Sequence, residues 1–172
     1  EISFLCITLH CICYNHYNIY WFSCIVLWRP YMYYKRKNTD YYTNRHSCFL
    51  LQYHLVLVTK YRHPVITGDL ERYLLFYAKE YFKERGMVIQ AIESMPDHMH
   101  ILFDAPPQIN LADFINAFKS ASSRKVRQNY PEQLKPYYWK PYFWSLSYFI
   151  GSVSEKTTSA VKHYIQHQKY LL

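Results

Sequence analysis

The apolar residues of this chain are grouped into short runs that predict four strands. The run at 49–59, FLLQYHLVLVT, is rich in aliphatic and β-branched residues and predicts a central strand. Residues 87–93 and 98–104 predict two more strands, which a Pro-Asp turn joins into a hairpin. A fourth strand is expected within 142–153, where Gly151 breaks the run.

Three further segments repeat apolar residues at the spacing of an amphipathic helix. The first begins near Thr67 and ends at Gly86, and the second covers 111–127. The third runs from Ser154, whose hydroxyl can cap a helix, to Lys169. The order β-α-β-β-α-β-α predicts an α+β, ferredoxin-like fold with helices packed on one face of a mostly antiparallel sheet.

Residues 1–33 differ in composition from the rest of the chain. Their charged side chains are Glu1 and Arg29, they do not begin with Met, and their two apolar runs are each shorter than a membrane helix of ~20 residues. We interpret 1–33 as an atypical apolar segment outside the working domain, which would then span 34–172. Translation of sequence upstream of the true start is our preferred origin for it, and a membrane anchor or a genuine extension stay open.

The overall charge points to an anionic partner. The formal net charge is +8, and the twenty Tyr, ten Phe and four Trp supply rings that could stack on bases, although most of them are expected in the core. Four of the five Cys lie in the first 24 residues, in no zinc-binding or disulfide spacing. These features favour a nucleic-acid partner and a reducing, cytoplasmic location. We do not expect a membrane partner.

Two histidines of the predicted 98–104 strand are candidates for metal binding. His98 and His100 are two residues apart, so they project from the same face while Met99 faces the other way. Two imidazoles make half of a divalent-metal site, with a third ligand still to come from elsewhere. A satisfied structural pair and part of a zinc site are the alternatives.

Basic residues gather at the end of the first strand and along the second helix. Lys60-Tyr61-Arg62 combines two cations with a ring, and the far end of the helix combines cations with hydroxyls. Such groups can neutralise and hydrogen-bond a phosphate backbone, although solvated surface is an equally good interpretation. The candidates for contact with nucleic acid are Lys60, Arg62, Lys119, Ser123, Arg124, Lys125 and Arg127.

Four sequence pieces, in order, resemble one known family over residues 35–169. They are the first-strand segment, the His-hydrophobic-His motif, the basic motif of the second helix, and the last strand and helix. The family is the single-tyrosine HUH transposases of small bacterial insertion sequences, often called the TnpA type, to which the REP-associated tyrosine transposases are related. The matching residues are 53–62, 97–100, Lys119 with 122–124, and 149–151 with 161–168.

The resemblance implies a fold, an activity and a set of site residues. It implies the HUH endonuclease fold, with His98, His100 and Gln168 binding Mg²⁺ or Mn²⁺ and with Tyr164 as nucleophile. The activity implied is that of a metal-dependent DNA transposase, which cleaves and rejoins single-stranded DNA at insertion-sequence ends through a 5′-phosphotyrosine intermediate. Subterminal DNA hairpins as the recognised feature, a homodimer and the lack of a nucleotide cofactor are further expectations.

The sequence also departs from the family pattern and leaves other functions open. Ser120 stands where the family usually has Gly, and the turn before the last helix has few glycines, which bears on how easily that helix moves. A domesticated or inactive hairpin-binding protein of the same fold is the main alternative. A replication-initiation or relaxase nuclease, and a metallohydrolase without a covalent intermediate, are the others.

Overall fold

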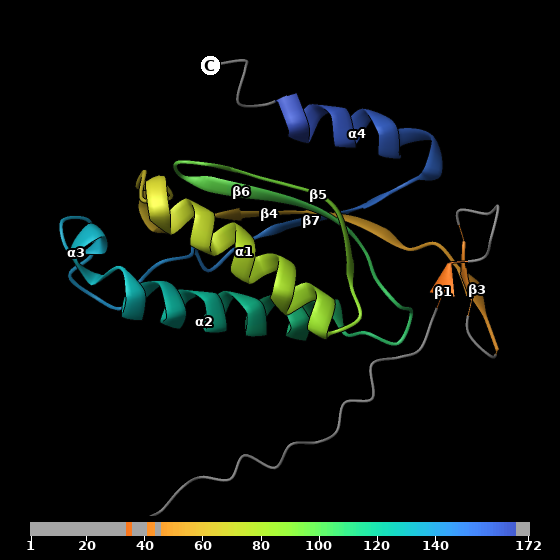
Figure 1. Ribbon diagram of the computed structural model, residues 1–172, viewed down its shortest axis with the longest axis horizontal. Coiled ribbons are helices and arrows are strands. Elements are labelled where there is room, and N and C mark those ends of the chain that lie inside the picture. The colour runs from red at the N-terminus through yellow and green to blue at the C-terminus, as the bar shows by residue number, and fades with distance from the viewer. Residues whose placement is uncertain (1–33, 36–40, 44–45, 168–172) are drawn as a thin grey trace, which may run out of the picture.

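A four-stranded antiparallel sheet is the centre of the computed structural model, which describes residues 34–35, 41–43 and 46–167 (Figure 1). The strands lie in the order β5-β6-β4-β7, so the two central strands are β6 and β4. Each neighbouring pair is antiparallel. The strand bounds are β4 Gln52–Val58, β5 Val88–Met95, β6 His98–Asp104 and β7 Phe149–Val153.

Helices cover both faces of this sheet. The helices α1 (Gly68–Glu84) and α2 (Leu111–Asn129) pack on one face, and α4 (Glu155–His167) lies on the other (Figure 1). The short elements are a 3₁₀ turn at Lys60–Arg62 and the helix α3 at Pro131–Leu134. A small separate sheet is formed by β1 Tyr34–Lys35, β2 Tyr42–Thr43 and β3 Cys48–Phe49.

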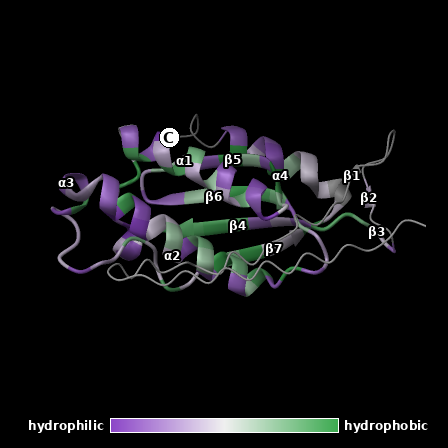
Figure 2. Cartoon of the chain, turned by 60° about the horizontal axis from the view of Figure 1, so that its bottom comes forward, coloured by the Kyte–Doolittle hydropathy of each residue, from purple (hydrophilic) through white to green (hydrophobic). Residues whose placement is uncertain are grey.

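The main core lies between the sheet and the α1–α2 layer. Met99, Ile101 and Phe103 of β6 point into it and are fully buried. Phe82 and Phe118 pack against each other edge to face, with 5.3 Å between their ring centroids. Figure 2 shows the C-terminal part of β4 in the hydrophobic colour, its N-terminal part in paler to hydrophilic colours, and α3 largely in the hydrophilic colour.

A second, smaller apolar cluster lies on the opposite face of the sheet. Ile165 of α4 is fully buried against Ala91 and Leu102, and Val153 and Val161 pack around them. Burial on both faces explains why Ile101, Leu102 and Phe103 of β6 are apolar in succession.

The predicted order of the main elements, the α+β class and the antiparallel sheet are confirmed. The small sheet β1–β3 and the helix α3 were not predicted, and Phe49, expected in the central strand, belongs to β3. The expectation that the helices share one face of the sheet holds for α1 and α2. The helix α4 packs on the other face, because its apolar residues Val161 and Ile165 contact Ala91 and Leu102 there. Gly151 does not break the last strand but lies within β7, paired with His54. Residues 1–33 and 168–172 lie outside the described part of the chain. None of the helices in the described part is both long and apolar enough to cross a membrane.

Candidate functional site

The two histidines of β6 lie on the face of the sheet that α4 covers. Met99 between them points into the main core and is fully buried, so the two-residue period of the strand turns His98 and His100 the other way. Their ring centroids are 5.0 Å apart and the rings are nearly perpendicular, at 80°. The structure therefore brings the two imidazoles together on one face, as expected from their spacing.

Tyr164 of α4 lies next to this pair. Its ring meets the His100 ring edge to face, at 6.1 Å between centroids and 88° between planes. The neighbouring residue Ile165 is buried against the sheet, which fixes how α4 is turned, and Tyr164 keeps 49% of its surface exposed. Gln168, the expected third ligand, lies outside the described residues.

His100 is buried and has one ring nitrogen occupied by another histidine. It is 6% exposed, and its Nδ1 is hydrogen bonded to Nε2 of His54 at 2.9 Å. Nε2 of His100 is also buried and has no hydrogen-bond partner among the residues that the structure describes. Burial first, and then the nearby His54 and His98, lower the pKa of His100 from 6.5 to about 4. A neutral imidazole with an unpartnered, buried nitrogen fits a divalent cation.

His98 is oriented by a different neighbour. Its Nδ1 donates to Oδ1 of Asp97 at 2.5 Å, and Oδ2 of the same carboxylate accepts from Nε of Arg62 at 2.9 Å. Burial tends to raise the pKa of Asp97, but its hydrogen bonds and ion pairs with His98 and Arg62 outweigh that and hold it below its ordinary value. Any cation bound by His98 would therefore meet its Nε2.

No further metal-binding group completes the pair within the described ranges. Across residues 34–35, 41–43 and 46–167, no three His, Cys, Asp or Glu side chains are arranged to hold a metal ion. The two imidazoles are thus a half-site there, and a full site needs a ligand of another type or from outside these residues.

The basic turn after β4 adjoins the histidines and has an unusual backbone. Tyr61 and Arg62 have positive φ angles of 61° and 56°, a region that non-glycine residues seldom occupy. Nζ of Lys60 lies 4.8 Å from the centroid of the Tyr61 ring and 5.5 Å from that of Tyr142. Tyr61 is 61% exposed, and Arg62 connects the turn to His98 through Asp97. Such strain often accompanies a functional loop.

The basic residues of α2 are arranged differently. Nζ of Lys119 donates to the carbonyl of Leu146 at 2.6 Å, and burial lowers the pKa of Lys119. Nη1 of Arg127 donates to the carbonyls of Lys140 and Tyr142 at 3.2 and 3.1 Å. These two cations fasten the segment before β7 to the helix layer.

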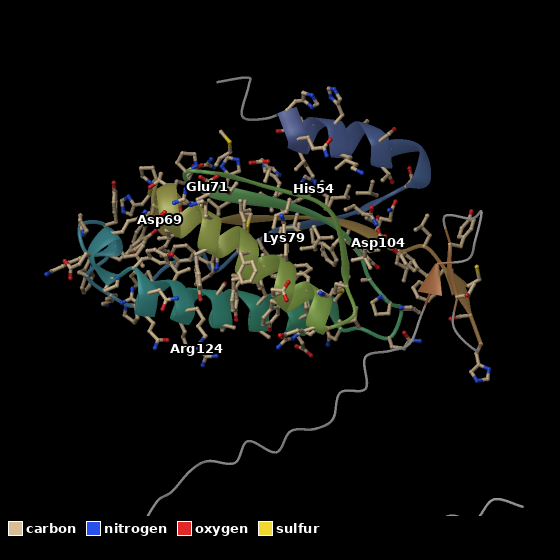
Figure 3. All side chains as sticks on the ribbon, in the orientation of Figure 1. His54, Asp69, Glu71, Lys79, Asp104 and Arg124 are labelled. Carbon is tan, nitrogen blue, oxygen red and sulfur yellow. The ribbon has the colours of Figure 1, made fainter. Side chains whose placement is uncertain are left out.

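The remaining α2 candidates face away from the histidines. Arg124 and Lys125 are exposed and Ser123 is half-buried. Figure 3 shows Arg124 on the outer side of α2, across the sheet from α4 and from His54. The predicted nucleic-acid contacts are therefore divided between a group beside His98 and a group on the opposite layer.

His54 and Asp97 are functional candidates for which the sequence analysis assigned no role. The two-residue period does place His54 on the face opposite Leu55 and Leu57. Its nearness to His100 depends on the register between β4 and β6, which pairs Val56 with His100 and His54 with Leu102. Asp97 precedes His98 directly, so its proximity could have been inferred.

Comparison with known proteins places this arrangement in a protein class. Residues 47–168 match the family model described as Transposase IS200 like. The chain is 38% identical over 120 residues to the ISDra2 transposase TnpA of Deinococcus radiodurans, covering 70% of this chain and 85% of that protein. It is 28% identical over 123 residues to the transposase for insertion sequence element IS200 of Salmonella typhimurium, covering 72% of this chain and 80% of that protein.

Solved structures give the same class. A crystal structure of a candidate transposase from Deinococcus radiodurans R1 superposes with a TM-score of 0.61 at 34% identity, covering 73% of this chain and 96% of that one. A REP-associated tyrosine transposase bound to a REP hairpin superposes with a TM-score of 0.54 at 12% identity, covering 75% and 74%. The fold is therefore that of the tyrosine transposases. The chain belongs to the IS200-like transposase family, and its relatives support a transposase function.

Proposed function

We propose that this protein is a DNA transposase that cleaves and rejoins single-stranded DNA with Tyr164 as the nucleophile. The observation that carries the proposal is the Tyr164 ring, 6.1 Å from that of His100, whose buried Nε2 has no partner among the described residues. Family membership supplies the general activity, and this geometry supplies the residues that would perform it.

The reaction conserves the energy of the bond that it breaks. The Tyr164 hydroxyl oxygen attacks the phosphorus of a phosphodiester, forms a phosphotyrosine and loses its proton. The bond from phosphorus to the 3′ oxygen breaks, and that oxygen takes up a proton to become a free 3′-OH. Attack by a 3′-OH on the 5′-phosphotyrosine then rejoins DNA and restores the tyrosine, so no nucleotide cofactor is required.

The chain's own residues would orient and neutralise the scissile phosphate. His98 and His100, with Gln168, would hold Mg²⁺ or Mn²⁺, which when bound supplies a Lewis acid to polarise the phosphate. With its pKa lowered to about 4, His100 is neutral at pH 7 and keeps a lone pair for a ligand. Lys60 and Arg62, beside His98, would bind the DNA backbone.

Several features support a DNA hairpin as the recognised partner. The chain is strongly basic, with a formal net charge of +8, and a structural neighbour with the same fold is bound to a REP hairpin. Subterminal hairpins at the element's ends are therefore the proposed recognition feature. A homodimer and a cytoplasmic location are part of the same proposal and rest on the family resemblance.

The proposal is tested by a covalent-adduct assay with labelled single-stranded DNA that carries a hairpin end of the element. Wild-type protein with Mg²⁺ or Mn²⁺ is expected to give an SDS-stable protein–DNA adduct that EDTA prevents. Tyr164→Phe removes the nucleophilic oxygen but keeps the ring against His100, so it should bind the hairpin normally and form no adduct.

Two outcomes would contradict this assignment. Adducts that persist in Tyr164→Phe would place the nucleophile on another residue, with Tyr148→Phe serving as a matched control for tyrosine loss near α2. Tight hairpin binding by the wild type without any adduct would instead identify a hairpin-binding protein that has lost its activity.

A further inference from the structure

The histidine of β4 has contacts that the proposed reaction does not yet use. His54 lies on the α4-facing side of the sheet (Figure 3). Its ring stacks on that of His100, with 5.2 Å between centroids and 16° between planes. Its Nε2 is the 2.9 Å hydrogen-bond partner of Nδ1 of His100. The ring of Phe149 also meets the His54 ring edge to face, at 6.1 Å between centroids.

The backbone opposite His54 gives this packing its room. Gly151 is the β7 residue paired with His54, so a side chain there would share the same face. A Cβ placed on Gly151 would come within 3.2 Å of the Phe149 ring. The missing Cβ at Gly151 thus leaves room for the Phe149 ring beside the His54 ring.

The hydrogen bond between the two histidines can be arranged in two ways. A neutral imidazole has one N–H donor and one acceptor nitrogen, so one of the two rings must donate. If His100 donates from Nδ1, its lone pair lies on Nε2, the buried nitrogen without a partner among the described residues. In the reverse arrangement Nε2 of His100 would carry the proton, leaving a buried N–H donor without an acceptor, which is unfavourable.

We propose that His54 is a positioning residue that holds His100 in the Nδ1–H tautomer and so directs the Nε2 lone pair of His100 toward the divalent cation. Histidine ligands commonly donate their other N–H to a neighbouring acceptor, which fixes both the tautomer and the orientation of the ring. For His98 the acceptor is the carboxylate of Asp97, and for His100 it is the neutral imidazole of His54. This inference rests on the metal site of the proposed function.

The first test reads the tautomer in metal-free protein. Long-range ¹H–¹⁵N correlation spectra of protein labelled at histidine nitrogens distinguish Nδ1–H from Nε2–H imidazoles. Wild-type His100 is expected as the Nδ1–H form, and His54→Leu, which offers no acceptor, is expected to lose that pattern. Nε2–H on His100 in the wild type would overturn the proposal.

The second test measures Mn²⁺ affinity by calorimetry on the full chain. His54→Leu should weaken binding by about 10-fold or more, as loss of such outer partners usually does. His54→Gln, whose side-chain oxygen can accept the same hydrogen bond, should recover most of the affinity. His46→Leu, at an exposed histidine that precedes β3, should not change it. Full affinity in a folded His54→Leu variant would overturn the proposal.

The two readouts separate this inference from the proposed function. Wild-type protein that forms no adduct, but shows the Nδ1–H tautomer and loses Mn²⁺ affinity in His54→Leu, would refute the transposase mechanism and support the role of His54. Adduct formation that disappears in Tyr164→Phe but is unchanged, together with Mn²⁺ affinity, in His54→Leu would do the reverse.

Discussion

A single buried imidazole connects the stability of this protein to its proposed chemistry. His100 of β6 is almost fully buried on the sheet face that α4 covers, next to the imidazoles of His54 and His98. No carboxylate of the described residues is hydrogen bonded to it. Protonation of His100 is therefore unfavourable in the folded state, and its pKa falls to about 4. The feature that keeps His100 ready for a ligand also makes folding sensitive to acid.

The acid sensitivity can be measured in metal-free protein. The folded-state pKa of about 4 lies below the ordinary value of 6.5, so between these values the unfolded chain binds a proton that the folded chain does not. The free energy of unfolding should thus fall by about 3 kcal/mol from this group as the pH drops from above 6.5 to 4. His100→Gln should remove this part of the pH dependence in denaturant titrations with EDTA.

An exposed histidine supplies the control for this measurement. His46→Gln replaces an exposed imidazole with the same amide side chain, so it controls for the loss of one histidine as such. Parallel pH curves for the wild type and His100→Gln would show that His100 titrates as an ordinary imidazole, and the account of its burial would then be wrong.

At the scale of elements, α4 is held to the sheet by few contacts. Its apolar contact is the small cluster around Ile165, far smaller than the core beneath α1 and α2. A polar connection adds to it, since Oγ1 of Thr158 donates to Oε1 of Gln52 at 2.5 Å and Nε2 of Gln52 donates to the buried carboxylate of Asp104 at 2.8 Å. The helix that carries Tyr164 is thus an element whose docking can be weakened without unfolding the core.

Truncating the apolar anchor should undock α4 selectively. Ile165→Ala removes a fully buried side chain, and such truncations usually cost 2 kcal/mol or more, which would lower the docking equilibrium about 30-fold. Hydrogen exchange of the α4 amides should accelerate and adduct formation should slow, while exchange in β4 and β6 stays protected.

Ile115→Ala is the matched control for the helix anchor. Ile115 is equally buried but lies in the main core, so its truncation should lower protection across the sheet and not in α4 alone. If Ile165→Ala destabilised the whole sheet to the same extent, α4 would be an integral part of the cooperative core.

The same elements show what the sequence could and could not predict. Strand periodicity correctly placed His98 and His100 on one face, because that relation is local to β6. The face on which α4 packs is set by a contact between Ile165 and Leu102, far apart in the chain, and its apolar stripe is compatible with either face. The hydrogen bond between His54 and His100 likewise depends on the register of β4 against β6. The family motif therefore indicated His100 as a ligand but not His54 as its hydrogen-bond partner.

At the scale of the whole molecule, the basic candidates lie on two layers separated by the sheet. Lys60 and Arg62 belong to the turn beside His98. A single DNA strand that enters the proposed site would pass along this turn. Arg124 is on the outer side of α2, on the layer away from α4 (Figures 1 and 3). A short single strand that reaches Tyr164 therefore has good access to the first group and poor access to the second.

This division predicts different effects of neutralising the two groups. With a short, hairpin-free oligonucleotide, Lys60→Gln should weaken binding. It should also reduce the slope of log K against log salt concentration by about the contribution of one phosphate contact, because each neutralised phosphate releases its counterions. Arg124→Gln removes one charge of the same sign and should leave both quantities nearly unchanged. Fluorescence titrations between low and moderate salt measure the slopes directly. Equal losses in the two variants would mean that the strand contacts the outer face of α2, and that the path to Tyr164 inferred from the turn beside His98 is wrong.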